Sequence, residues 1–340
     1  MKYKYSYKLF LLLIVLLTFC SKSEEIVLNS TVLNGVSVST WMYQIQGLEK
    51  MESVDKLFNT KYDMFVVEPG FNFKDEPYDT AYIVSKLKKK PDGKRRILLA
   101  YIDIGEAEDY RSYWESDWVA PDKTHPGKPD FLITEDPDGW SGNYPVAYWD
   151  KCWQNIWLGK NGIIEQLANY GFDGVYLDWV EAYDDDSVRE FGEKQGVNTE
   201  KEMMKFIESI RAKGRTIRPD FLIISQNAPY LIDTSPDYYA SLIDGFAAED
   251  TWFYGDGDAE WDSSDAGDLT GGDRQSDDYS TKNRIIQYKK YLKLGVPVFT
   301  VDYCISKKNA ESVYEASIEN GFIPLVTRVS LSRITETPPF

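Results

Sequence analysis

The stretch Gly171-Phe-Asp-Gly-Val-Tyr-Leu-Asp-Trp179 carries the signals that decide the fold. Gly171 follows a helical segment and is expected to end it, because glycine readily adopts the left-handed conformation at a helix C-terminus. Residues Gly174–Trp179 then form a nearly continuous apolar run, which is typical of a parallel strand covered on both faces. The stretch therefore predicts a helix followed by a buried strand, the repeating unit of an α/β protein.

The same alternation extends in both directions from this unit. Further strands are predicted at Val38–Gln46, Met64–Glu68, Ile97–Ile104, Phe221–Asn227, Gly245–Glu249, Val296–Tyr303 and Ile323–Arg328. Helices are predicted at Leu48–Phe58, Thr80–Lys89, Cys152–Tyr170, Thr199–Thr216, Pro236–Leu242, Thr281–Leu294 and Lys308–Glu319. Eight strands alternating with helices predict a single (β/α)8 TIM barrel over residues 36–334. Only Val329–Phe340 follows the last strand, so the last helix is expected to be short or missing.

Composition narrows the chemistry. The chain has 340 residues, of which 43% are hydrophobic, so it can bury a large core. Its net charge of −17 argues against nucleic acid as a partner, because a phosphate backbone attracts clustered Lys and Arg. The single histidine, His125, excludes multi-histidine zinc sites and disfavours Ser-His-Asp and Cys-His triads. We therefore expect carboxylate chemistry that uses neither a cofactor nor a metal.

The N-terminus predicts export. Three lysines precede the apolar run Leu9–Phe19, which is the pattern of a signal peptide over residues 1–19 and falls short of the roughly 20 residues that span a bilayer. Cys20 follows and resembles the lipidated first residue of a mature bacterial lipoprotein, which would be held at the cell envelope by its lipid anchor alone. An ordinary secretory signal, leaving a secreted or periplasmic protein, is the alternative. Removing the three lysines deepens the net charge from −17 to −20.

The two remaining cysteines, Cys152 and Cys304, could form a disulfide or remain separate thiols. An exported compartment permits a disulfide between them, whereas two separate thiols are slightly favoured. The mature protein is expected to be a monomer.

Polar side chains follow most of the predicted strands. In a barrel of this kind the active site lies at the C-terminal ends of the strands. A carboxylate that follows at least four apolar residues lies at the mouth of the core, where desolvation raises its pKa. This argument favours a catalytic or binding role for Asp178 and Glu249, and leaves Asp103 and Asp302 evenly balanced between function and ordinary loop-start acids.

Aromatic residues accompany these polar groups at the predicted rim. Flat rings beside acids and amides suit a sugar, because its C–H face packs on the ring while its hydroxyls bind the polar groups. The candidate substrate-binding residues are Tyr43, Glu68, Tyr101, Asp103, Trp149, Trp179, Glu181, Gln226, Asn227, Asp250, Trp252, Asp302 and Tyr303.

Four segments together resemble a known family. Leu99-Ala-Tyr-Ile-Asp-Ile-Gly-Glu-Ala-Glu108, Val146-Ala-Tyr-Trp149, Gly171–Trp179 and Ser225-Gln-Asn-Ala228 are similar to glycoside hydrolase family 114, the endo-α-1,4-polygalactosaminidases and their relatives. The similarity runs from about Thr40 to Arg333. Some relatives carry a cysteinyl-tRNA-synthetase-like label, but the H-I-G-H signature of that activity needs two histidines.

The resemblance implies a retaining mechanism with a nucleophilic Asp at the end of the fourth strand and an acid/base Glu at the end of the sixth. Carried over, these are Asp178 and Glu249, with Asp250 as the neighbouring alternative to the second. The expected function is an exported, endo-acting hydrolase of an α-linked amino-sugar polysaccharide. Its acidic cleft would concentrate a cationic substrate such as partly deacetylated galactosaminan.

Three alternatives remain at this point. The loop Gly255–Ser280 holds nine acids against Arg274 and is interpreted as a solvated loop or a substrate-facing flap rather than a calcium site, because Trp261 and Gly267 stand where an EF-hand needs Gly and Glu. The whole protein could instead be a catalytically silent saccharide-binding lipoprotein. It could also be an exo-acting α-glycosidase whose site is laid out like that of an α-galactosidase.

Overall fold

The computed structural model describes residues 27–335. The predicted signal peptide and Cys20 lie outside this range, as do residues 336–340. Within residues 27–335, no helix combines the length and the apolar character needed to cross a membrane.

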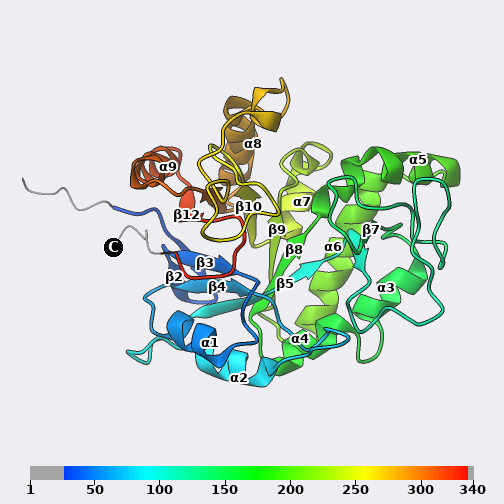
Figure 1. Ribbon diagram of the computed structural model, residues 1–340, viewed down its shortest axis with the longest axis horizontal. Coiled ribbons are helices and arrows are strands. Elements are labelled where there is room, and N and C mark those ends of the chain that lie inside the picture. The colour runs from blue at the N-terminus through cyan, green and yellow to red at the C-terminus, as the bar shows by residue number, and fades with distance from the viewer. Residues whose placement is uncertain (1–26, 336–340) are drawn as a thin grey trace, which may run out of the picture.

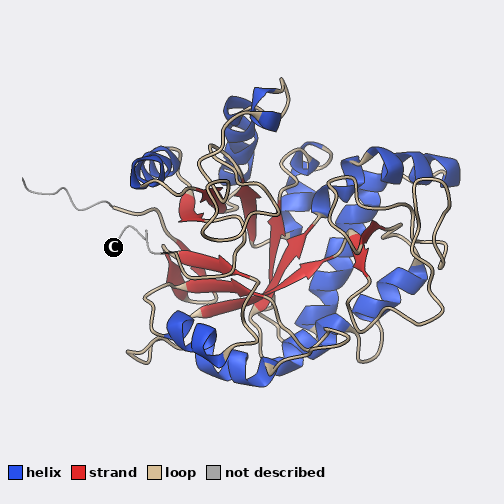
Figure 2. Cartoon of the chain, in the orientation of Figure 1, coloured by secondary structure: helices blue, strands red, loops and turns tan. Residues whose placement is uncertain are grey.

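Eight parallel strands form the central sheet, with helices packed around its outside (Figures 1 and 2). In spatial order they are β3 (Trp41–Gln44), β4 (Met64–Val67), β5 (Ile97–Asp103), β8 (Gly174–Asp178), β9 (Leu222–Gln226), β10 (Gly245–Glu249), β11 (Val298–Tyr303) and β12 (Ile323–Thr327). Two antiparallel strand pairs lie outside this sheet: β1 (Thr31–Leu33) forms a hairpin with β2 (Val36–Val38), and β6 (Glu106–Glu108) pairs with β7 (Asn143–Pro145). The predicted (β/α)8 barrel is confirmed.

The helices occupy the connections between the strands. They are α1 (Met51–Phe58), α2 (Thr80–Leu87), α3 (Lys151–Leu158), α4 (Ile163–Tyr170), α5 (Asp186–Gln195), α6 (Thr199–Arg215), α7 (Pro236–Leu242), α8 (Thr281–Lys293) and α9 (Lys307–Glu319). Short 3₁₀ turns are η1 (Val180–Asp184), η2 (Leu231–Asp233) and η3 (Gly272–Gln275). After β12 the described chain, which ends at residue 335, contains no helix, in line with the expected short or missing last helix.

Three local predictions were wrong in detail. The helix predicted over Cys152–Tyr170 is two helices, α3 and α4, because the chain turns between Gly159 and Gly162; a β-carbon on Gly162 would lie 2.6 Å from the Trp157 carbonyl oxygen. The strand predicted from Val38 starts instead at Trp41, since Val38 pairs within the β1–β2 hairpin. Helix α5 was not predicted.

The stretch Gly171–Trp179 has the expected form. Gly171 ends α4 in the left-handed conformation, with φ of 105°. The carboxylate of Asp173 is fully buried at the start of β8 and accepts hydrogen bonds from Arg95 and Lys88 at 2.9 and 3.0 Å. Four parallel bonded pairs then join β8 to β9. Asp173 is therefore a structural anchor at the barrel end opposite to Asp178.

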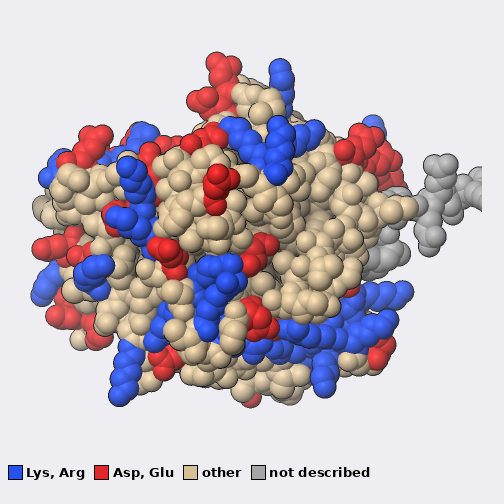
Figure 3. Space-filling model, turned by 180° about the vertical axis from the view of Figure 1, so that it is seen from behind, with Lys and Arg blue, Asp and Glu red and all other residues tan. Residues whose placement is uncertain are grey.

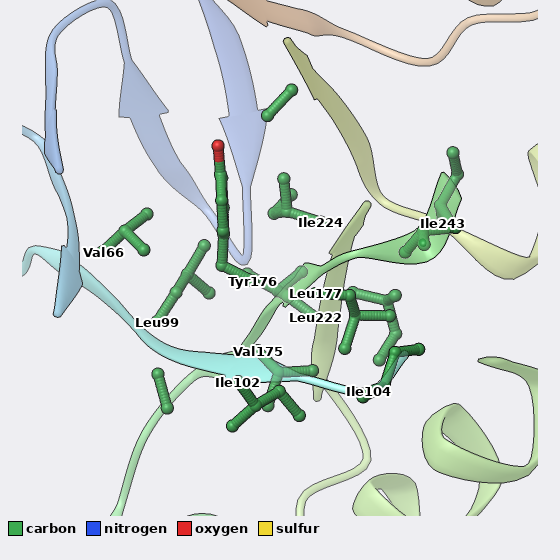
Figure 4. Packing of buried hydrophobic residues seen from close by; sticks show 14 of the residues in the cluster. Val66, Leu99, Ile102, Ile104, Val175, Tyr176, Leu177, Leu222, Ile224 and Ile243 are labelled. Atoms are coloured by element: carbon green, nitrogen blue, oxygen red, sulfur yellow. The ribbon is translucent and has the colours of Figure 1, made fainter. Parts of the chain in front are cut away.

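Alternation along the strands separates the two faces of the sheet. In Figure 4, Tyr176 lies on the same side of the strands as Val66 and Leu99, whereas Val175 and Ile102 lie on the opposite side. Because side chains repeat every second residue along a strand, Asp178 shares the inner face with Tyr176. The inner face thus carries aromatic residues in the barrel and a carboxylate at its rim.

The barrel closes between β3 and β12 without a backbone ladder in the described part of the chain. The indole nitrogen of Trp41 donates to the carbonyl of Ile323 at 3.0 Å across this seam. Just beyond β3, the amides of Ile45 and Gln46 both donate to the carbonyl of Leu331, at 3.1 and 3.2 Å. Side-chain and loop contacts therefore close the barrel where strand pairing does not.

The two cysteines of the described range are separate thiols. Cys152 is exposed on α3, and Cys304 is buried after β11. The disulfide alternative is thereby excluded.

Candidate active site

A cavity of about 590 Å³ opens at the C-terminal ends of the strands. Its lining contains ten carboxylates and, among the described residues, one basic side chain, Arg111. The carboxylates are Glu68, Asp103, Glu106, Glu108, Asp136, Asp138, Asp178, Glu181, Glu249 and Asp250. The cavity therefore offers a strongly negative environment at the place where a barrel of this kind carries its chemistry.

Asp178 ends β8 and lies in the cavity wall. Its Oδ2 accepts a hydrogen bond from the Tyr101 hydroxyl at 2.5 Å, and its Oδ1 accepts one from the Trp179 amide at 2.7 Å. Burial, followed by the charge of Glu249, raises the pKa of Asp178 to about 7. Asp178 can therefore gain or lose a proton near neutral pH.

Glu249 ends β10 and lines the same cavity. Three side chains donate to its carboxylate: Tyr303 to Oε1, and Gln226 and Asn227 to Oε2, the last at 2.8 Å. Burial raises the pKa of Glu249, and these three hydrogen bonds oppose that effect because they favour the ionised form. The carboxylate is thus held in one orientation by β9 and β11, its two neighbours in the sheet.

Three successive strands end in the same unusual backbone conformation. Trp179 after β8, Asn227 after β9 and Asp250 after β10 have φ of 46°, 54° and 58°. Non-glycine residues adopt this left-handed region at a cost of about 1 kcal/mol or more, and such residues concentrate at functional sites. The sharp turns let the chain leave the barrel immediately after each strand, so the rim beside Asp178 and Glu249 stays open.

A second pair of acids follows β5. Asp103 is buried, and its Oδ1 accepts hydrogen bonds from the amides of Gly105 and Glu106, both at 2.9 Å. Burial and the charge of Glu106 raise the pKa of Asp103 well above its usual range. Burial, followed by the charge of Asp136, raises the pKa of Glu106 to about 9. Both acids are therefore harder to ionise than ordinary exposed carboxyls.

Sequence reasoning missed the ionic cluster centred on Arg111. Arg111 donates to Glu68 at 2.8 and 3.0 Å and to Glu108 at 2.7 and 3.0 Å, and all three side chains are buried. Its guanidinium also lies 4.7 Å from the ring centre of Phe73. Glu68 was predicted as a substrate-binding residue, and its carboxylate is instead occupied by this arginine. Arg111 lies 43 residues away in the chain, so no local pattern connects the two.

The structure brings most of the predicted site residues to the cavity. Besides Asp178 and Glu249, its lining includes Tyr43, Glu68, Tyr101, Asp103, Trp179, Glu181, Asn227, Asp250 and Tyr303.

Four predicted residues lie elsewhere. Gln226 is buried outside the cavity lining and donates a hydrogen bond to Glu249. Trp149 donates from its indole nitrogen to Gln195 on α5 at 2.8 Å. Trp252 packs against the core clusters. The buried carboxylate of Asp302 accepts hydrogen bonds from the amides of Trp252 and Phe253 at 2.6 and 2.9 Å, which fixes the turn after β10.

Among its described residues, the acidic loop Gly255–Ser280 borders the cavity only through Gly255 and Gly257. Some of its acids have structural partners: Asp268 accepts from the amides of Ile305 and Ser306, and Asp262 contacts Arg333 at 3.0 Å. In the described part of the chain, no group of three or more His, Cys, Asp or Glu residues is arranged to hold a metal ion. These two acids therefore help to fix the conformation of the loop.

Charge is distributed unevenly over the molecule. On the face opposite to that of Figure 1, groups of Lys and Arg alternate with Asp and Glu (Figure 3). Several bases of the chain have acidic partners outside the cavity, such as Lys86 with Asp55 at 2.7 Å and Lys90 with Asp63. The cavity lining has no such balance, since its ten carboxylates accompany one basic side chain among the described residues.

Comparison with known proteins identifies the family. The profile described as "Glycoside-hydrolase family GH114" matches residues 29–339. A protein of Deinococcus radiodurans described as uncharacterized is 30% identical over 303 residues, covering 89% of this chain and 84% of its own. An uncharacterized protein of Methanocaldococcus jannaschii is 28% identical over 328 residues, covering 91% of this chain and 82% of its own.

Solved structures show the same fold at low sequence identity. Ega3 of Aspergillus fumigatus, in a complex with galactosamine, superposes with a TM-score of 0.56 at 14% identity, over 90% of this chain and 98% of Ega3. The glycoside hydrolase domain of PelA from Pseudomonas aeruginosa gives a TM-score of 0.57 at 12% identity, over 87% and 97% of the two chains. With its match to the family profile over almost the whole chain and a carboxylate-lined cavity at the barrel rim, the protein belongs to glycoside hydrolase family 114 and is a glycoside hydrolase.

Proposed function

We propose that the protein is a retaining glycoside hydrolase that cleaves an α-linked amino-sugar polysaccharide, with Asp178 as the nucleophile and Glu249 as the acid/base. The observation that supports this most is the placement of these two carboxylates at the ends of β8 and β10, in the wall of one cavity, where the charge of Glu249 helps to raise the pKa of Asp178. The family resemblance supplies the assignment of the two roles.

The positions of the strands suit a retaining mechanism. That mechanism needs the two carboxyl groups about 5–5.5 Å apart. One strand, β9, separates β8 from β10, so their backbones are about 9–10 Å apart. Both carboxylates line the same cavity, which is the arrangement that such a separation requires.

The reaction has two steps. Ionised Asp178 attacks the anomeric carbon, the bond to the leaving oxygen breaks, and that oxygen takes the proton of Glu249. The anionic Glu249 then takes a proton from water, whose oxygen attacks the anomeric carbon and releases Asp178 as a carboxylate. The hydrogen bonds from Tyr303, Gln226 and Asn227 stabilise Glu249 in its anionic form between the two steps.

Charge supports an amino sugar as the substrate. The cavity has ten carboxylates in its lining, and a polymer with free amino groups carries positive charge at neutral pH. A neutral α-glucan gains nothing from this field. The cavity is also bordered by Tyr101 and Trp179, which are partly exposed and offer ring surfaces for sugar faces.

Export and lipidation are part of the proposal and rest on residues 1–20 alone. We infer that the mature chain begins at Cys20 and is held at the cell envelope by a lipid anchor as a monomer. Globomycin treatment or a Cys20→Ser substitution should leave the precursor unprocessed, and the mass of the mature N-terminus measures this. Normal processing of the Cys20→Ser chain would leave the secretory alternative.

The deciding experiment is hydrolysis by the purified protein of partly deacetylated α-1,4-galactosaminan and of a panel of α-glucans, with the products read by mass. We expect galactosamine-containing oligosaccharides with retained anomeric configuration. Asp178→Asn and Glu249→Gln should each lower turnover by roughly 10³-fold or more. Asp92→Asn, which removes one carboxylate at an exposed turn before β5, is the matched control and should keep full activity.

The outcomes separate the alternatives. Products from α-glucans alone would overturn the substrate while keeping the fold. Binding of the polymer without any product would favour the silent saccharide-binding protein. Monosaccharides as the first products would favour the exo-acting alternative.

A further inference from the structure

The last backbone carbonyl of β10 has no partner in the strand ladder. Toward β9, the amide of Asn227 donates to the carbonyl of Ala247 at 2.9 Å. Bonds of a parallel ladder repeat every second residue, so the carbonyl of Glu249 would next meet the amide of residue 229. That residue is Pro229, which has no N–H. The sheet therefore leaves the carbonyl of Glu249 to be bound by a group from elsewhere.

Helix α8 supplies the missing donor. Nη1 of Arg284 donates to the Glu249 carbonyl at 3.0 Å, and Nε of the same side chain donates to the Tyr279 carbonyl at 2.9 Å. The guanidinium also lies 5.7 Å from the centre of the Tyr279 ring. Because a guanidinium is planar, two carbonyls bound at once fix its orientation. Arg284 thus joins the end of β10 to the loop that precedes α8.

The start of α8 makes two further contacts at the strand ends. The Thr281 hydroxyl donates to the carbonyl of the fully buried Thr251 at 2.7 Å. The Tyr279 hydroxyl donates to Asp184 at 3.3 Å, in the turn η1 that follows β8. The first turn of α8 and the residues before it therefore contact the chain just beyond both of the strands that carry the proposed catalytic carboxylates.

Arg284 also brings positive charge toward Glu249. Burial raises the pKa of Glu249, and the hydrogen bonds to its carboxylate and then the charge of Arg284 oppose this rise. Among the described residues, the cavity lining includes Arg111 and not Arg284. The effect of Arg284 on a bound sugar is therefore exerted through Glu249.

We propose that Arg284 is a positioning residue for the acid/base, because it replaces the missing ladder bond and holds the end of β10 where the Glu249 carboxyl reaches the leaving oxygen. This inference rests on the proposed function, which gives Glu249 that role. Proton transfer in the transition state requires hydrogen-bond distance between the two groups. A displaced strand end should therefore slow the step that needs the proton more than any other step.

The leaving group distinguishes lost acid catalysis from general damage to the fold. Two aryl α-glycosides of a galactosamine oligosaccharide are compared, one with a dinitrophenyl and one with a phenyl leaving group. Dinitrophenolate departs without a proton, whereas phenolate needs an acid. Arg284→Met should lower kcat/KM roughly tenfold or more for the phenyl glycoside and less than about threefold for the dinitrophenyl glycoside.

Two further variants complete the test. Arg284→Lys keeps the charge and loses the planar fork, so it should show a smaller loss of the same kind; it decides the question if Arg284→Met does not fold. Arg211→Met is the matched control. Arg211 on α6 donates to the carbonyl of Leu242 at 3.0 Å and to Asp244 at 2.7 Å, at the opposite end of β10. Its loss should leave the ratio of kcat/KM for the two glycosides as in the wild type.

Defined outcomes overturn the inference. An equal loss for both glycosides in the Arg284 variants, or no loss for either, would refute it, as would the same selective loss in Arg211→Met. The proposed function fails separately, if the wild-type protein cleaves neither glycoside or if Glu249→Gln loses activity equally toward both.

Discussion

The hydrogen bond from Tyr101 to Asp178 gives a sharp test of the nucleophile. The Tyr101 hydroxyl donates to Oδ2 of Asp178 at 2.5 Å and favours the ionised carboxylate. A hydrogen bond to a charged group contributes about 1.5–3 kcal/mol, and 1.36 kcal/mol corresponds to one pKa unit. Tyr101→Phe should therefore raise the pKa of Asp178 from about 7 to about 8–9.

The consequence for activity has a definite sign. The nucleophile must be ionised, so the acid limb of the pH profile of kcat/KM should move upward with the pKa of Asp178. At pH 7 the ionised fraction falls from about one half to between about one tenth and one hundredth, which lowers kcat/KM about 5- to 50-fold. Raising the pH should restore part of the lost activity, up to the basic limb at which Glu249 loses its catalytic proton.

The assay is release of reducing ends from galactosaminan between pH 5 and 10. Tyr176→Phe is the matched control, because it removes the same group from a buried tyrosine whose hydroxyl has no hydrogen-bond partner in the described range. An unchanged acid limb in Tyr101→Phe would refute the reasoning. An upward move of the basic limb alone would exchange the roles of Asp178 and Glu249.

Three further predictions concern stability and the residues that lie outside the cavity. The free energy of unfolding should fall as pH rises from about 5 to about 9, by up to about 1.4 kcal/mol per pH unit for each proton involved. The reason is that Asp103, Glu106 and Asp178 keep protons in the folded protein at pH values where the unfolded chain has released them. Urea unfolding across this range measures the change, and a free energy that does not vary with pH would contradict it. Asp302→Ala should lower the free energy of unfolding by about 2–4 kcal/mol, since two amides lose their acceptor. A variant with unchanged stability and a raised KM would instead place Asp302 in the substrate site. Trp149→Ala should cost about 1–3 kcal/mol in urea unfolding through lost contacts with Phe191 and Gln195 while KM stays the same; a raised KM at unchanged stability would restore its predicted role.

Strand-end carboxylates were predictable from sequence, but the direction of each side chain was not. Asp178 and Asp302 both follow apolar runs, and only Asp178 lines the cavity. The hydroxyl of Tyr303 reaches Glu249 from the inner face of β11, so Asp302, one residue earlier, must face the other way. Side chains alternate between the two faces of a strand, so a shift of one residue exchanges the inward and outward sets. The sequence does not define the position of a strand to within one residue.

The fold itself was predictable because apolar runs and glycine stops are local signals. The helix break between Gly159 and Gly162 has the same kind of local signal, yet the apolar pattern of Cys152–Tyr170 continues through it. Arg111 had no local signal at all, since its partner Glu68 comes from a distant strand. Contacts between distant segments decide which acids of the rim are free for a ligand and which are already bound.

The seam between β3 and β12 has a consequence for how the molecule resists self-association. Two facing strand edges without a ladder expose backbone groups that could pair with a strand of another molecule. Here the edges are only four and five residues long, and Leu331 takes up the amides of Ile45 and Gln46 directly beyond β3. Edges that are short, buried and locally occupied give an incoming strand few free backbone groups to pair with.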